Sequence, residues 1–174
     1  MALLDKLDNI KFMRTHFTRG LSFIELIVVI AILATLMSIA VVSLNGIQRR
    51  ANIDATLLTI ITDLKQQQQK AMSGDTEGRS THDMYGAYFQ TNSYTLFHGS
   101  KYSAADTANF VIPIDSSLQF TSITLPQSQI IYASGSGEIV GYVAGSNTFT
   151  LKNTVTNEQK TVTLNQYGVI TAIN

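Results

Sequence analysis

The side chains that could carry out chemistry are few and scattered. His82, Asp83 and His98 could bind a metal ion, but two histidines with neither a Cys nor an i, i+4 partner more often lie on a surface. Asp75, Glu77 and Asp83 share one short stretch and could offer oxygen atoms to Ca²⁺, which needs about 6–8 of them. Neither set has the spacing of a known binding loop. We therefore expect no metal and no cofactor.

No catalytic constellation can be recognised. The 174-residue chain contains no Cys, which excludes a thiol nucleophile, a disulfide scaffold and Cys-based zinc or iron–sulfur sites. Ser134–Gly137 is rich in Ser and Gly, but it lacks the flanking residues of a nucleophile elbow or a phosphate loop and predicts a turn. No set of Ser, His and Asp residues has a spacing that indicates a catalytic triad. We therefore expect that the protein is not an enzyme.

The charge balance argues against nucleic acid as a partner. Twelve basic residues balance twelve acidic ones, so the chain has no excess of positive charge to attract phosphates. From Met84 to the C-terminus the only basic residues are Lys101, Lys152 and Lys160. We expect no strong nucleic-acid binding.

One acidic residue is notable for its surroundings. Glu25 lies four residues inside an apolar segment, and no charged residue follows it until after Gln48. In Leu26–Leu44 the polar residues are Thr35, Ser38 and Ser43. As a helix this run would be about 29 Å long, close to the thickness of a bilayer core. An ionisable group at the edge of such a run is a functional candidate.

The residues before the apolar run predict its orientation in a membrane. Basic residues outnumber acidic ones in the first twenty residues, where Lys6, Lys11, Arg14 and Arg19 face Asp5 and Asp8. The positive-inside rule then predicts a single-pass protein of the cytoplasmic membrane, with its N-terminus cytoplasmic and its C-terminal body extracytoplasmic. A cleaved secretory signal would have a shorter run and an A-x-A-like site, whereas an uncleaved anchor on an extracytoplasmic binding or enzymatic domain remains an alternative.

The segment Arg19–Ala31 (RGLSFIELIVVIA) resembles the class III signal of type IV prepilins and pseudopilins. That signal has a basic leader, a Gly, a cleavage point, four mostly apolar residues, a Glu and an unbroken apolar helix. The match covers about 25 residues, and its motif is specific. The resemblance implies a structural subunit of a type IV pilus-like filament, either a type II secretion pseudopilus or a type IV pilus.

The resemblance also implies roles for individual residues. A prepilin peptidase would cut between Gly20 and Leu21, after a leader whose basic residues include Lys11, Arg14 and Arg19. Leu21, where most members have Phe, would then be N-methylated, and Glu25 would pair with the new α-amino group of a neighbouring subunit. The implied partners are that peptidase, other pilin or pseudopilin subunits, the inner-membrane assembly platform and, before assembly, the lipid bilayer.

Helical spacing continues beyond the apolar run. Apolar residues recur at steps of three and four from Ile47 to Met72, and Gly74 and Gly78 end the pattern. We predict one helix of about 50 residues from Leu21, apolar all round in its first half and one-sided in its second. Many pilins have Pro where this chain has Val42, so we expect a straighter helix, with any bending near Asn45-Gly46.

The C-terminal part reads as a β body. Short β-type runs follow a loop at Ser73–Asp83, and alternation is clearest in Thr148–Leu151 and Thr161–Leu164. The expected fold class is α+β: a long N-terminal helix with a hydrophobic first half, packed by its second half on an antiparallel body, with two small sheets. The order of features resembles H-type minor pseudopilins.

The expected regions are 1–20 leader, 21–46 transmembrane or filament-core helix, 47–73 amphipathic half and 74–174 body. Strands are expected at Met84–Gln90, Ser93–His98, Asn109–Ile112, Leu118–Thr124, Gln129–Ala133, Glu138–Val143, Thr148–Val155, Thr161–Leu164 and Gly168–Ile173.

Overall fold

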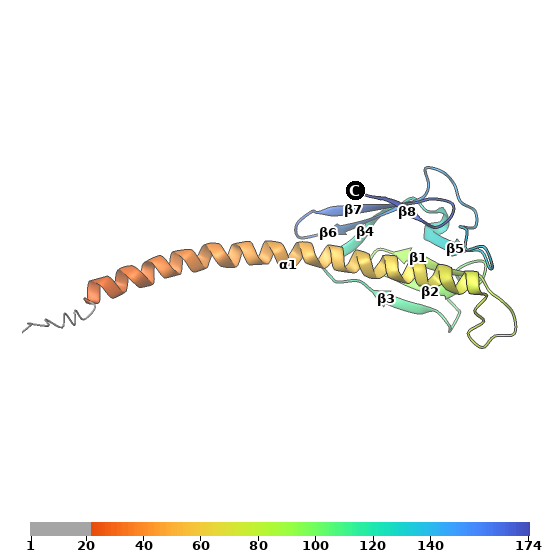
Figure 1. Cartoon of the computed structure of the whole chain (residues 1–174), viewed down its shortest axis with the longest axis horizontal. Helices are drawn as coiled ribbons and strands as arrows, with labels where there is room; N and C mark the ends of the chain where they lie inside the picture. The colour runs from red at the N-terminus through yellow and green to blue at the C-terminus, as the bar shows by residue number, and fades with distance from the viewer. Residues whose placement is uncertain (1–21) are drawn as a thin grey trace, which may run out of the picture. The chain divides into compact units, whose positions relative to one another are not determined.

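The structure is a computed structural model that describes the backbone of residues 22–174 and the side chains of residues 22–38 and 52–174 (Figure 1). Contacts divide the chain into two units, Met1–Ser43 and Leu44–Asn174. The first described element, α1, is an α-helix of 51 residues, Phe23–Ser73. The strands all follow it in sequence.

Local hydrogen bonds explain where α1 begins and where it ends. At the start, the backbone N–H of Ser22 donates to Oε2 of Glu25 at 3.3 Å, as the Glu of a capping box does. At the end, Gly74 adopts φ 65°, Asp75 N donates to Lys70 O at 3.0 Å and Gly74 N donates to Ala71 O at 3.3 Å. These two bonds form a Schellman motif, which ends a helix where a left-handed residue is present.

The predicted fold class is contradicted in its helices. A helix beginning at Leu21 was expected, but α1 begins at Phe23, because Ser22 lies at its non-helical capping position. A second, short 3₁₀ helix, η1, occupies Pro126–Ser128 and was not expected from the sequence. Proline fits the first position of such a turn because its fixed φ is helical and it needs no backbone partner there.

Two antiparallel four-stranded sheets make up the body. The first has the order β3-β2-β1-β5, and the second has the order β4-β6-β7-β8. The strands of the first sheet are β1 (Tyr85–Gln90), β2 (Ser93–His98), β3 (Phe110–Pro113) and β5 (Gln129–Tyr132). Those of the second are β4 (Leu118–Ile123), β6 (Thr148–Asn153), β7 (Gln159–Leu164) and β8 (Ile170–Ile173). The strand expected at Glu138–Val143 is wrong: this segment forms only an isolated bridge between Tyr132 and Ile139.

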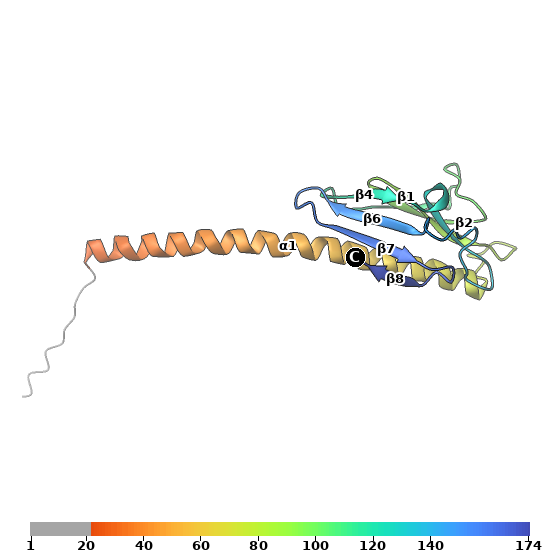
Figure 2. The same ribbon diagram turned by 90° about the horizontal axis from the view of Figure 1, so that it is seen from above.

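One face of α1 and both sheets share a hydrophobic core. The buried helix residues Ile53, Leu57, Ile60, Leu64 and Ala71 recur at steps of three, four and seven, so they lie on one side of the helix. In Figures 1 and 2 the strands lie beside this part of α1.

Aromatic rings join the two sheets across the core. The ring of Phe89 in β1 stacks on that of Phe149 in β6, with centroids 4.8 Å apart, and meets that of Phe120 in β4 edge-on at 5.3 Å. Offset-stacked and edge-on pairs of this kind add to the burial energy. The body is therefore held as one packed unit.

The predicted localisation is also contradicted. Among the described residues, no helix is both long and apolar enough to cross a membrane. Crossing a bilayer core takes about 20 consecutive apolar residues in one helix, and no described stretch meets that requirement. The prediction of a single-pass protein of the cytoplasmic membrane is therefore wrong.

Candidate functional site

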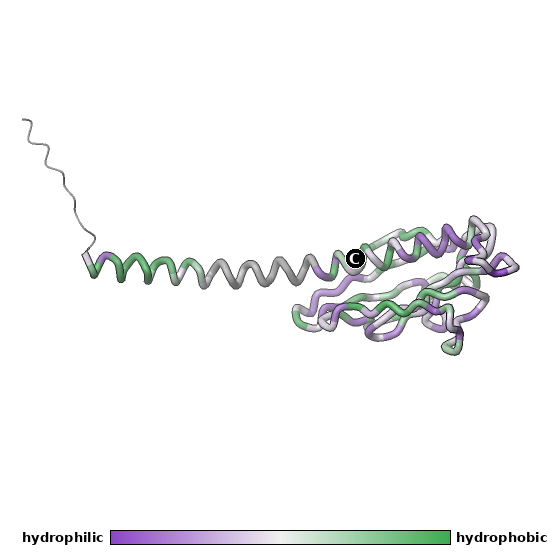
Figure 3. The backbone as a smooth tube through the Cα atoms, turned by 90° about the horizontal axis from the view of Figure 1, so that it is seen from below, coloured by the Kyte–Doolittle hydropathy of each residue, from purple (hydrophilic) through white to green (hydrophobic). Residues whose placement is uncertain are grey.

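The first described turns of α1 carry a continuous apolar surface. Its large side chains are 44–78% exposed, and because they occupy nearly every position they lie on all sides of the helix. Figure 3 colours this stretch of backbone as mostly hydrophobic. Soluble proteins rarely expose apolar patches of such extent without a binding partner. We call this the N-terminal apolar surface; it consists of Phe23, Ile24, Leu26, Ile27, Val28, Val29, Ile30, Ile32, Leu33, Leu36 and Met37.

The two hydroxyl groups in this stretch do not make it polar. Thr35 Oγ1 donates to Ile32 O at 2.8 Å, and Ser38 Oγ donates to Ala34 O at 2.8 Å. Each hydroxyl proton is therefore taken by the backbone of the preceding turn, a common arrangement for Ser and Thr within helices. An apolar partner could pack here without leaving a buried hydroxyl group that lacks a hydrogen-bond acceptor.

Glu25 is the one charged side chain on the described part of this surface. Its Oε2 accepts the Ser22 N–H, and among residues 22–174 Oε1 has no hydrogen-bond partner. A carboxylate near a helix N-terminus is also stabilised by the helix dipole. Glu25 therefore has a local structural role, and it can still accept a hydrogen bond or ion pair from another chain.

The other residues singled out from the sequence signal lie outside the described part of the chain. These are the cleavage-site residues Gly20 and Leu21 and the leader residues Lys11, Arg14 and Arg19. Ser22 was not singled out, although the spacing S-x-x-E of Ser22 and Glu25 is a recognisable capping-box pattern.

The structure brings two of the candidate metal ligands together, Asp83 and His98, and leaves His82 apart from them. His98 meets two carboxylates, Asp83 at 2.9 Å through Nδ1 and Asp106 at 3.1 Å through Nε2. His82 turns instead to the carbonyl oxygen of Gly74. Within the described residues no three ligand-type side chains gather closely enough to hold a metal ion.

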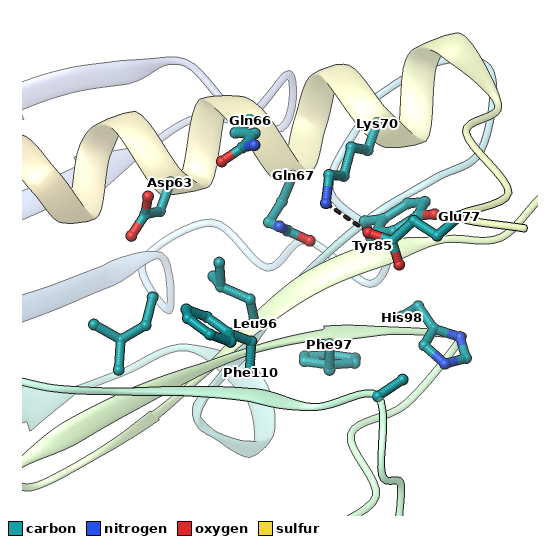
Figure 4. Close-up of a pocket in the computed structure, with 12 residues that line it drawn as sticks. Asp63, Gln66, Gln67, Lys70, Glu77, Tyr85, Leu96, Phe97, His98 and Phe110 are labelled. Carbon is teal, nitrogen blue, oxygen red and sulfur yellow. Dashed lines mark hydrogen bonds and ion pairs between the residues drawn. The ribbon is translucent and has the colours of Figure 1, made fainter.

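A second feature, missed from the sequence, is a cleft between α1, β2 and β3 (Figure 4). It has a volume of about 260 Å³. Its residues lie up to about fifty positions apart in the chain, so no local motif could have revealed it. They are Asp63, Gln66, Gln67, Lys70, Glu77, Tyr85, Leu96, Phe97, His98, Ala108, Phe110 and Ile112. We call it the α1–β3 cleft.

The charges at the rim of the α1–β3 cleft are paired. Lys70 Nζ lies 2.5 Å from Glu77 Oε1, and Arg79 Nη1 lies 3.1 Å from Glu77 Oε2. The hydrogen bond from Lys70 is the main reason why the pKa of Glu77 is below its ordinary value, with Arg79 adding to the effect. Next to the cleft the Tyr94 hydroxyl donates to Asp63, and burial together with this bond raises the pKa of Tyr94.

The comparisons with known proteins give no relative. No family model matches the chain, and neither the curated proteins nor the solved structures contain a match. The function therefore has to be inferred from the chain's own residues.

Proposed function

We propose that the protein is a structural subunit of a type IV pilus-like filament and assembles through the N-terminal apolar surface. The observation that supports this most directly is the exposure of large apolar side chains all round the start of α1. A helix that is apolar on every side is normally buried among other helices. Copies of the same helix would supply such partners.

The energetics favour bundling of this segment. Burial of apolar surface contributes about 25 cal/mol per Å², so packing even part of several exposed Ile, Leu and Val side chains yields several kcal/mol per subunit. Phe23, Leu36 and Met37 are 78, 58 and 72% exposed, which leaves much area to bury. The hydroxyl groups of Thr35 and Ser38 already donate within the helix and would not oppose it.

Glu25 would control the register of assembly. After cleavage between Gly20 and Leu21, the Leu21 α-amino group of one subunit would meet the Glu25 carboxylate of its neighbour. N-methylation of Leu21 would keep that amine cationic. An unpaired charge among apolar helices is costly, so subunits docked out of register are disfavoured. The structural support is that Glu25 is exposed and that only Oε2 is engaged by Ser22.

The first experiment tests processing. The full chain would be co-expressed with a prepilin peptidase, and the mass of the product measured. We expect cleavage between Gly20 and Leu21, and no cleavage in Gly20→Glu, because the peptidase needs a small residue there. An intact wild-type chain would reject the assignment to this family.

The second experiment isolates Glu25. In Glu25→Ala, processing should be normal, but filament yield should fall, because truncating one member of a buried ion pair costs about 3–5 kcal/mol. The matched control is Glu25→Gln, which keeps an acceptor for Ser22 N–H but removes the charge. If helix capping alone mattered, Glu25→Gln would assemble normally, whereas the ion-pair role predicts that both variants fail.

A further inference from the structure

The two walls of the α1–β3 cleft differ in chemistry. The wall supplied by α1 is polar, with Asp63, Gln67 and Lys70 at successive turns. The opposite wall, supplied by β2 and β3, includes Leu96, Phe110 and Ile112. Figure 4 shows the α1 side chains directed toward the strands. A ligand that fits must therefore be polar on one side and apolar on the other.

Gln67 is the unusual member of the polar wall. The residue is only 3% exposed, but its amide borders the cleft and is not among the fully buried side-chain atoms that lack a partner within the described residues. Figure 4 shows the amide extending from α1 into the space between helix and strands. An amide that borders the cleft can bond a ligand there. Since an amide both donates and accepts, a hydroxyl group, which also does both, is a suitable partner.

Phe110 is the unusual member of the apolar wall. It lies on β3, an edge strand, and is 65% exposed, whereas Leu96 and Ile112 beside it in the cleft are partly buried. A ligand that covered this ring would remove its apolar surface from water, which is favourable. The flat face of such a ring packs well against the C–H face of a pyranose ring, as aromatic side chains do against other flat apolar surfaces.

The charges around the cleft exclude a strongly charged ligand. Both oxygens of Glu77 are engaged, by Lys70 and by Arg79. One oxygen of Asp63 is taken by the hydroxyl of Tyr94. The lining has two carboxylates, Asp63 and Glu77, against one basic side chain, Lys70, so it disfavours a phosphate, whereas a cation finds three of the four carboxylate oxygens already engaged. Lys70 keeps further N–H donors that can serve a hydroxyl oxygen.

We propose that the α1–β3 cleft binds a neutral sugar, one pyranose unit at a time. The amide of Gln67 and the free oxygen of Asp63 bind its hydroxyl groups, and Phe110 covers its apolar face. The cleft volume of about 260 Å³ is sufficient for a single hexose unit. This activity is independent of filament assembly, because the cleft lies in the body and not on the N-terminal apolar surface.

The test uses the full chain in a phosphocholine detergent, since glucoside detergents would compete for the cleft. Saturation-transfer NMR would be recorded with the methyl glycosides of glucose, galactose, mannose and N-acetylglucosamine. We expect transfer to at least one of them, with Kd on the order of 1 mM, as befits a ligand of about a dozen heavy atoms. Absence of transfer to all four would overturn the proposal.

Two variants and two matched controls locate the binding. Gln67→Leu removes the amide at nearly constant volume, and Phe110→Ala removes the ring from an exposed edge; each should raise Kd at least tenfold. Gln69→Leu changes an exposed Gln of the same helix, and Val155→Ala changes another exposed apolar residue; both should bind as the wild type does. Phe110→Ala decides the question if Gln67→Leu does not fold.

Two further outcomes would overturn the proposal. One is binding that is unchanged in both Gln67→Leu and Phe110→Ala, because the sugar would then lie elsewhere. The other is tighter binding of a capped dipeptide, N-acetyl-Ala-Ala-amide, that is lost in the same two variants, because the cleft would then be a peptide site.

Discussion

The two ends of α1 differ in what covers their apolar side chains. Leu36, near the start, is 58% exposed, whereas Leu57, near the end, is 4% exposed. Both are leucines in one continuous helix. The difference lies in the partner: the strands of the same chain cover Leu57, and nothing within the described residues covers Leu36. That a segment is helical therefore says little about its function. Whether its apolar side chains are buried by the same chain is more informative.

The same comparison separates two kinds of stability. The buried end of α1 contributes to the unfolding free energy of the body, because its side chains leave water when the chain folds. The exposed end gains nothing from folding of the single chain and can gain only from association. Substitutions in the two segments should therefore alter different measurements.

The largest effect is expected from removing the exposed end. A chain that starts at Gln48 should be monomeric and should unfold cooperatively, while the full chain self-associates without detergent, because the N-terminal apolar surface is missing from the shorter chain. Analytical ultracentrifugation and circular dichroism of both chains measure this. Aggregation or loss of folding in the shorter chain would show that the body depends on the first part of α1.

Leu57→Ala should destabilise the body more than any other single substitution proposed for it. It leaves a cavity at a 4% exposed position and should lower the unfolding free energy by about 3 kcal/mol. Its neighbour provides a matched control: Leu58 is 65% exposed, so Leu58→Ala should change stability by about 0.5 kcal/mol or less. Urea denaturation compares the two variants, and equal losses for Leu57→Ala and Leu58→Ala would contradict the burial argument.

Leu36→Ala should resemble Leu58→Ala in its unfolding free energy but should weaken self-association.

Gly86→Ala should weaken the body by about 2 kcal/mol without altering self-association. A Cβ at this position would lie 2.3 Å from Ile130 O and 2.8 Å from Cζ of Phe97, so β5 would have to move away from β1. The control is Gly135→Ala, where a Cβ meets no atom within 4 Å and only the positive φ of 84° is strained. Thermal denaturation should show a smaller loss for Gly135→Ala, by about 1 kcal/mol. The reverse order would mean that β1 and β5 are less closely packed than described.

The smallest expected effect is the loss of stability at low pH that comes from Glu77. The pKa of Glu77 is lowered from 4.5, mainly by its hydrogen bond from Lys70, so its ion pairs stabilise the folded state above pH 4.5. That contribution is lost as the pH falls below 4.5 and through the still lower pKa of the folded state. Since Glu77 is partly exposed, the loss should not exceed about 1 kcal/mol. Urea denaturation from pH 7 to 3 should show less pH dependence in Glu77→Gln than in wild type; identical profiles would refute this contribution.

The sequence predicted the strands better than the ends of the helices. The strand at Ser93–His98 is confirmed with identical bounds, because it is rich in the aromatic and β-branched residues that favour strands, such as Tyr94, Thr95 and Phe97. The start of α1 was misplaced by two residues because the capping box of Ser22 and Glu25 was overlooked. The strand expected at Glu138–Val143 failed because glycines at 137 and 141 adopt positive φ and turn the chain.

The α1–β3 cleft could not have been predicted in the same way. Its polar wall lies on one helix, where Gln67 belongs to a run of four glutamines that looks uniformly solvated. Only the fold separates them: Gln67 is buried, Gln69 is exposed, and Gln68 bonds to distant carbonyls. Such distinctions depend on contacts between residues far apart in the chain, which local pattern does not encode.

The bonds of Gln68 also bear on the order of events during synthesis. Its Nε2 donates to Gly137 O at 2.9 Å and to Tyr167 O at 2.7 Å, across 69 and 99 residues of sequence. At about 5–20 residues per second, a ribosome takes about 5–20 s to extend the chain from Gln68 to Tyr167. During that interval the strands that cover the buried face of α1, from β1 to β7, are made one after another. The two bonds that hold Gln68 therefore form only near the end of synthesis, after most of the body has been made.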